Sequence, residues 1–193
     1  VIWRHNDPED LDRKLAAIDR DRPKIVAFES VYSMDGDSAP LKEITEICAK
    51  IGVALIVDEA HAVGIFGKGK GLVEELGLEQ QVFARVITFG KAYGCHGAAI
   101  LGSNDLKDYL INFSRPLIYT TALPLQSVLS IKKAHEFLGE NIVRIEKLKD
   151  YIEYFKELTV NCKLSTDNSK SAIQCVIVEG NDEVKSLAEK IQQ

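Results

Sequence analysis

The sequence contains little that would suit a membrane or a nucleic-acid partner. No apolar run approaches the ~18–20 residues that a helix needs to span a bilayer. Basic residues are the minority, with 24 Lys and Arg against 29 Asp and Glu, whereas a nucleic-acid-binding face would need a basic excess. The opening VIWRHNDPEDL also lacks the basic-then-apolar order of a signal peptide. We therefore expect neither a membrane nor a nucleic acid as partner.

Cysteine is sparse, and no two cysteines are close in sequence. Positions 48, 95, 162 and 175 are widely spaced and form no CxxC pair, so neither zinc nor a redox motif is indicated. HExxH is absent as well. In the DEAH letters at 58–61, Asp58 and Glu59 would lie on opposite sides of a strand and could not converge on one ion. We expect no metal site, and a reduced, cytoplasmic setting.

A nucleotide-binding P-loop is also incomplete. The glycine-rich stretch 64–71 (GIFGKGKG) comes near the pattern GxxxxGK followed by Ser or Thr, but its last position is Gly71. The hydroxyl that would hold magnesium is therefore missing. The stretch also follows DEAH, which reverses the order found in P-loop proteins. A helicase or ATPase is thus disfavoured, and the stretch is expected to form a flexible or tightly turned loop.

The elements that are present predict an α/β fold. Apolar runs at 24–30, 53–57 and 82–89 are typical of strands buried on both faces of a parallel sheet. Helices are expected from Pro8, capped by Asp7, and from Pro40, closed by Gly52. The run at 98–103 follows its predecessor too closely for a parallel crossover, so it should pair antiparallel. These features indicate a three-layer αβα, mostly parallel sheet.

The remainder of the chain is predicted to be mainly helical. Helices are expected at 104–113, capped by Asn104 or Asp105, and at 125–138, 142–158 and 183–193, with an irregular passage at 114–124 and a strand at 172–179. Residues 1–3 resemble a truncated strand. We predict that residues 1–140 form the C-terminal part of a large domain, and residues 141–193 a linker helix and an incomplete small α+β domain.

Four polar side chains mark two strand ends about thirty residues apart. Asp58 and His61 follow LIV, and Thr88 and Lys91 follow VI. Singly, each has an ordinary structural explanation: Asp58 could cap a turn, and most lysines are solvated. A carboxylate, an imidazole, a hydroxyl and an amine that converge at strand ends suit a small phosphorylated cofactor. Burial of Lys91 would favour the neutral, nucleophilic amine.

Several blocks resemble the α-oxoamine synthases, pyridoxal-phosphate (PLP) enzymes of the aspartate-aminotransferase fold (PLP fold type I). The blocks are ESVYSMDGDSAPL, LIVDEAHAVGIFGKGKG, TFGKAYGCHGA, IYTTALP and the opening RHNDPEDLDRKL. The resemblance extends over nearly the whole chain. It implies a Claisen-like acyl transfer in which an amino acid attacks an acyl-CoA or acyl-ACP thioester and carbon dioxide is lost.

The same resemblance implies roles for single residues. Lys91 would bind PLP covalently and later remove the substrate Cα proton, while Asp58 would pair with the pyridine nitrogen. His61 and Ser33 would contact the cofactor around its phenolic oxygen, and Thr88 would hold the phosphate. The two remaining cofactor contacts, Thr120 and Thr121, would reach the phosphate of a partner subunit, which implies a homodimer with its active site at the subunit interface.

Other parts expected of the family are absent from this sequence. These are the upstream glycine-containing phosphate loop, the aromatic residue that stacks on the ring, and a downstream arginine for the substrate carboxylate; neither His5 nor His96 is in the stacking position. We therefore interpret the chain as a fragment that is inactive alone and has an exposed sheet edge or apolar surface. DEAH and the lysine block resemble those of the family's biotin-pathway members, which implies L-alanine and a pimeloyl thioester as substrates. Glycine-using members are one alternative, and a purely structural module is another.

Overall fold

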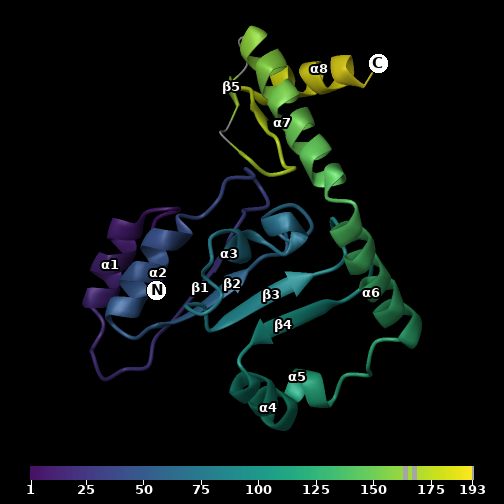
Figure 1. Cartoon of the computed structure of the whole chain (residues 1–193). Helices are drawn as coiled ribbons and strands as arrows, with labels where there is room; N and C mark the ends of the chain where they lie inside the picture. The colour runs from purple at the N-terminus through teal and green to yellow at the C-terminus, as the bar shows by residue number, and fades with distance from the viewer. Residues whose placement is uncertain (163–164, 167–168, 193) are drawn as a thin grey trace.

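The computed structural model describes residues 1–162, 165–166 and 169–192 and confirms the α/β architecture. Its main sheet has the order β1-β2-β3-β4, formed by β1 (Ile25–Glu29), β2 (Ala54–Asp58), β3 (Ala84–Thr88) and β4 (Ala98–Gly102). β1, β2 and β3 are parallel, and β4 pairs antiparallel with β3, as predicted. Figure 1 shows this sheet at the centre of the molecule.

Helices α1 (Pro8–Ala16) and α2 (Leu41–Lys50) pack on one face of the sheet (Figure 1). The Asp7 side chain caps α1 by accepting a hydrogen bond from the amide of Asp10, as expected. Gly52 closes α2 with a φ of +66°, a conformation that glycine adopts without strain. The core on this face joins Leu11, Leu15, Val26, Phe28, Leu41, Ile44, Leu55 and Val57.

The opposite face of β1 and β2 is not buried, so the prediction of burial on both faces is wrong for this chain. Side chains alternate along each strand, and the residues between the core positions are half-buried or exposed. Ile25, for example, is 64% exposed. The helical layer formed by α1 and α2 covers only the other face. Within the described residues, β1 and β4 also have no strand on their outer sides, so the expected open edge and apolar surface are present.

The segment between β2 and β3 is tightly turned. It contains the short 3-10 helix η1 (Gly67–Gly69) and α3 (Leu72–Glu75). Val63, Ile65 and Phe66 are buried there. The stretch is therefore packed into the core and does not form an open phosphate-binding loop.

After β4 the chain forms a series of helices: α4 (Asn104–Phe113), α5 (Arg115–Ile118), α6 (Leu125–Glu140) and α7 (Val143–Asn161). Ser103 caps α4, because its hydroxyl accepts from the amide of Leu106; the predicted caps at Asn104 and Asp105 are wrong. α5 lies in the passage that was expected to be irregular, where Pro116 suits the first turn of a helix.

The last part of the chain stands apart from the main sheet in Figure 1. It contains the two-stranded sheet of β5 (Ser165–Thr166) and β6 (Val176–Ile177), followed by α8 (Asn181–Ile191). The late strand is shorter than predicted, and Gln193, the predicted helix end, lies outside the described residues. Residues 1–3 form no strand. The division at residue 140 stays a prediction.

Candidate active site

The sheet register places the candidates Asp58 and Thr88 on one face, together with Glu29. Asp58 pairs with Glu29 on one side and with Val86 on the other. Paired residues share a face, and Thr88, two residues beyond Val86, shares it too. Glu29, Asp58 and Thr88 therefore lie at the carboxyl ends of β1, β2 and β3, on the face that α1 and α2 leave open. Ligands of open α/β sheets bind at this kind of edge.

The turn after β2 positions His61. Oδ1 of Asp58 accepts a hydrogen bond from the amide of Ala60 at 2.8 Å, and the carbonyl of Glu59 accepts from Ala62 at 2.9 Å. Asp58 thus does cap a turn, as its simpler structural interpretation requires. The cap occupies Oδ1 and leaves Oδ2 for a second partner, so the structural role does not exclude a role toward a ligand.

His61 is half-buried, and both its burial and the charges around it shift its pKa. Burial is the main cause that holds this pKa below its ordinary value, and the positive charge of Lys91 lowers it further. The carboxylates of Glu29 and Asp58 act in the opposite direction. Lys91, Asp58 and Glu29 are therefore all close enough to influence the imidazole. The structure thus places His61 within the electrostatic influence of Asp58 and Lys91, and the roles of these residues toward a cofactor stay predictions.

Lys91 lies in the loop that joins the antiparallel strands β3 and β4. The amide of Phe89 donates to the carbonyl of Gly97 at 2.9 Å, which extends the ladder beyond the strands, and the amide of Cys95 donates back to Phe89 at 2.7 Å. Inside this loop, the carbonyl of Lys91 accepts from Gly94 at 2.9 Å. Lys91 is exposed in this chain, so the burial that would favour its neutral amine is not present here.

Thr88 offers an observation that points to a ligand. Its Oγ1 is buried and, within the described residues, has no hydrogen-bond partner. Buried polar atoms in proteins are nearly always paired, so such an atom calls for an explanation. A hydroxyl left unpaired three residues before Lys91 suits an oxygen of a bound phosphate or phenolate. The residues present therefore fit a phosphorylated cofactor.

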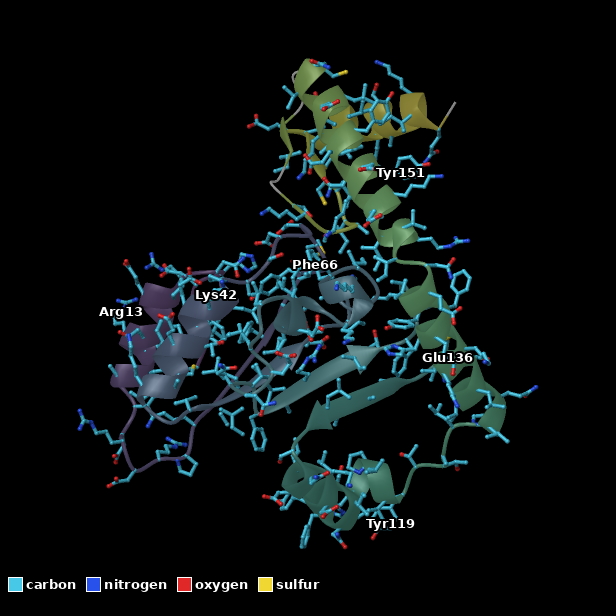
Figure 2. All side chains as sticks on the ribbon, in the orientation of Figure 1. Arg13, Lys42, Phe66, Tyr119, Glu136 and Tyr151 are labelled. Atoms are coloured by element: carbon cyan, nitrogen blue, oxygen red, sulfur yellow. The ribbon has the colours of Figure 1, made fainter. Side chains whose placement is uncertain are left out.

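The three other predicted cofactor contacts, Ser33, Thr120 and Thr121, do not lie on the strand ends that carry Asp58 and Thr88. Ser33 is exposed in the turn after β1, and Thr120 and Thr121 are exposed between α5 and α6. Figure 2 shows their neighbour Tyr119 beyond β4, on the far side from Phe66 of the glycine-rich stretch. Thr120 and Thr121 are therefore not brought to Lys91 within the described chain. Their exposure is compatible with the predicted reach toward a partner subunit, which stays a prediction.

Glu59 and Arg85 form a buried ion pair that the sequence pattern did not predict. Glu59 is 0% exposed and accepts from Nε of Arg85 at 2.6 Å and from the amide of Val73 at 2.9 Å. Nη2 of Arg85 also donates to the carbonyl of Lys70. The pair thus fixes both β3 and the start of α3 relative to the turn that carries Asp58 and His61. One sequence feature could have indicated this pair: successive side chains of a strand point to opposite faces, so Glu59 had to point away from Asp58.

Tyr93 connects the Lys91 loop to two other elements. Its hydroxyl donates to the carbonyl of Gly69 at 3.1 Å and lies 3.1 Å from Nδ1 of His135 on α6. The Tyr93 and His135 rings stack with centroids 6.1 Å apart. Burial raises the pKa of the phenol, so it stays a donor at neutral pH. Tyr93 therefore ties the Lys91 loop to the glycine-rich stretch and to α6.

Lowering the pH should destabilise the protein through His61. Since the folded-state pKa lies below 6.5, the unfolded chain binds the proton first as the pH falls. The free energy of unfolding should therefore decrease as the pH drops through 6.5 towards the folded-state pKa, and His61→Gln should flatten that decrease. Urea unfolding across this range measures it, with the exposed His96→Gln as control. An unchanged slope in His61→Gln would contradict the assignment.

Comparison with known proteins shows which family and which relatives this chain resembles. The family "aminotransferase class I and II" matches residues 2–193. An 8-amino-7-oxononanoate synthase of Emericella nidulans is 45% identical over 171 residues, which are 81% of this chain and 42% of that protein. A putative 8-amino-7-oxononanoate synthase of Bacillus cereus is 37% identical over 99% of this chain and 49% of that protein. The chain thus spans a little under half the length of these curated relatives.

Solved structures agree with the expected fold. A serine palmitoyltransferase from S. paucimobilis with a bound PLP–myriocin aldimine has a TM-score of 0.87 at 32% identity, over 93% of this chain and 47% of that one. An 8-amino-7-oxononanoate synthase from Francisella tularensis has a TM-score of 0.85 at 25% identity, over 98% and 55%.

These matches confirm both the PLP type I fold and the resemblance to the α-oxoamine synthases. No helix in the described part of the chain has the length and apolar character to cross a membrane. The chain belongs to the class I and II aminotransferase family, within the group of α-oxoamine synthases.

Proposed function

We propose that this chain is part of a PLP-dependent acyltransferase that joins an amino acid to an acyl thioester with loss of carbon dioxide. The observation that carries the proposal is the meeting of Asp58, His61 and Lys91 beside the unpaired hydroxyl of Thr88. When bound, PLP supplies an electron sink for the carbanion at the amino acid's Cα. Because the chain covers about half of its relatives, the activity belongs to the complete protein.

Each residue contributes a defined interaction. Lys91 would hold the cofactor covalently through Nζ and, once released from it, would receive the Cα proton at that atom. Oδ2 of Asp58, which its turn leaves available, pairs with the pyridine nitrogen and keeps it protonated. His61 stays neutral near pH 7, because its pKa is lowered, and contacts the phenolic oxygen together with Ser33.

The phosphate contacts complete the proposed site. Thr88 binds one phosphate oxygen, which satisfies its buried hydroxyl. Thr120 and Thr121 bind the phosphate of a partner subunit, so the enzyme is a homodimer with interfacial active sites. We further propose residues 1–140 as part of the large domain and 141–193 as the start of the small one. Four free cysteines suit a reducing cytoplasm.

The preferred substrates are L-alanine and a pimeloyl thioester, which is the 8-amino-7-oxononanoate synthase reaction of biotin biosynthesis. The 45% identical relative with that name supports this choice. Selection of an acyl chain by length rests on small energies, about 1–3 kcal/mol per methylene. A few residues outside this chain could therefore redirect it, and a direct assay is required.

Thiol release from the complete protein tests the substrates. Alanine, glycine and serine are crossed with pimeloyl, succinyl, acetyl and palmitoyl thioesters. We expect the highest kcat/KM for alanine with pimeloyl thioester. A preference for glycine with succinyl or acetyl thioester would reject the biotin assignment and keep acyl transfer. Protein that gains no violet absorbance band with PLP and releases no thiol would instead support a purely structural module.

A further inference from the structure

The turn that carries Ser33, residues 31–38, follows β1 and is closed by its own backbone. Val31 and Ser38 form an isolated bridge, and the amide of Gly36 donates to the carbonyl of Tyr32 at 3.0 Å. We call residues 31–38 the Ser33 turn. These local bonds define its shape, but a turn at the surface also needs contacts outside itself to keep one position.

One external support comes from the start of the chain. Nε2 of His5 lies 2.8 Å from Oδ2 of Asp37, and the amide nitrogen of the Asn6 side chain donates to the same oxygen at 2.6 Å. The His5 ring also packs edge-on against Tyr32, with centroids 4.3 Å apart. His5, Asp35 and Asp37 bring donor atoms within 4.8 Å of one another. We attribute this cluster to holding the turn, since His5 and Asn6 already satisfy Oδ2 of Asp37.

The second support comes from residues 169–175, which we call the C-terminal clamp. Oγ of Ser169 donates to the carbonyl of Gly36 at 2.7 Å, and Sγ of Cys175 donates to the carbonyl of Met34 at 3.0 Å. Ser169 and Ser171 are each 1% exposed, with their hydroxyls 3.0 Å apart. Figure 1 shows the C-terminal unit reaching down to the loop after β1.

The C-terminal clamp packs so closely against Gly36 that no side chain fits at this position. A Cβ added there would lie 2.7 Å from Oγ of Ser169 and 2.8 Å from Cβ of Ile173, and would collide with the carbonyl oxygen of Ile173. Its φ is +74°. The clamp binds the carbonyl of Met34, the residue directly after Ser33, and the carbonyl of Gly36, two residues further on. Any shift of the clamp is therefore passed to the backbone next to Ser33.

We propose that Ser169 is a positioning residue of the active site, which fixes the Ser33 turn and so sets where the Ser33 hydroxyl stands relative to the cofactor. Ser169 acts through Gly36 and touches no reacting atom. The proposal rests on the function proposed above, in which Ser33 contacts the phenolic oxygen. It couples the C-terminal unit to the site: the unit that begins near residue 141 holds the Ser33 turn, which follows the carboxyl end of β1.

The first measurement is amide hydrogen exchange in the complete protein without added PLP. Ser169→Ala should speed exchange within residues 31–38 by about fivefold, the factor expected for loss of one ordinary hydrogen bond. Ser130→Ala, at an exposed serine of α6, is the matched control and should change nothing there. Unchanged exchange in Ser169→Ala would overturn the proposal.

Substitutions of glycine test the contact between Ser169 and Gly36 by changing Gly36 instead of Ser169. Gly36→Ala and Gly52→Ala place alanine at nearly equal φ, +74° and +66°, but only Gly36 faces the clamp; a Cβ at Gly52 meets nothing within 4 Å. Gly36→Ala should therefore speed exchange both in residues 31–38 and in residues 169–175, and Gly52→Ala in neither. Equal behaviour of the two variants would count against the clamp.

The second measurement separates positioning from a merely structural role. The pH midpoint of the absorbance change of PLP-loaded protein should move in Ser169→Ala in the same direction as in Ser33→Ala, by a smaller amount. Faster exchange with an unmoved midpoint in Ser169→Ala would overturn the positioning role. An unmoved midpoint in Ser33→Ala would overturn it too, by removing the role of Ser33, while thiol release judges the acyltransferase separately.

Discussion

Replacing Lys91 by alanine in the complete protein should abolish covalent binding of the cofactor and lower turnover at least roughly 10³-fold. The positive charge of Lys91 lowers the pKa of His61, and Lys91 lies in a loop held by the Phe89–Gly97 and Cys95–Phe89 bonds. Alanine keeps the backbone of that loop and removes only the amine. Borohydride reduction followed by peptide mass mapping, together with thiol release, measures both effects.

A second lysine serves as the control for that experiment. Lys42 is exposed on α2, in the helical layer on the other side of the sheet (Figure 2). Lys42→Ala should keep both covalent binding and turnover. Cofactor fixed by borohydride to any lysine other than Lys91 would refute the assignment, whatever the activity of the variants.

Arg85→Met should lower the free energy of unfolding by about 3 kcal/mol or more, the usual result of removing one partner of a buried ion pair. Glu59, at 0% exposure, would lose its ionic partner and keep only the Val73 amide. Urea unfolding of the complete protein measures the loss. The exposed pair of Lys133 and Glu136 offers the contrast, because Lys133→Met removes an ion from water-accessible surface and should cost far less.

A double variant identifies the cause of that loss. In Glu59→Gln with Arg85→Met, no buried charge is left, and the glutamine oxygen still accepts from Val73. We expect this pair of changes to be more stable than Arg85→Met alone. The single variant Glu59→Gln completes the comparison. If the double variant lost as much stability as Glu59→Gln and Arg85→Met together, lost packing rather than an uncompensated charge would explain the effect.

The sequence predicted most of the main sheet and the position of Asp58, Thr88 and Lys91 at or just after strand ends, because both depend on local patterns. Apolar runs located β1, β2 and β3, and the short connection from β3 to β4 required an antiparallel pair. Asp58 and Lys91 follow their strands directly, so strand order was enough to place them there. The caps show the limit of such reasoning: Asp7 was correct, but Ser103 caps α4 in place of Asn104 or Asp105.

The features that were missed depend on contacts between residues far apart in the chain. The exposure of Lys91 and of Ile25 follows from what covers the sheet, which no local pattern reports. The partner of Glu59 is Arg85, 26 residues away. No spacing rule links Gly36 to Ser169, since their contact spans 133 residues. The only indication in the sequence was that Asp58 and Glu59 must point to opposite faces, which leaves Glu59 free for a role of its own, the ion pair with Arg85.

The span of the clamp also bears on the order in which the site forms during folding. The Lys91 loop is closed by Phe89 and Gly97, a short segment, whereas the bond between Ser169 and Gly36 closes a loop of 133 residues. Closing longer loops costs more entropy, and distant contacts form more slowly. On a chain synthesised from its N-terminus, the strand ends with Asp58 and Lys91 exist well before residue 169. We therefore expect Ser33 to be the last of these cofactor contacts to reach its final position, so that newly made protein would bind PLP before its pocket is fully shaped.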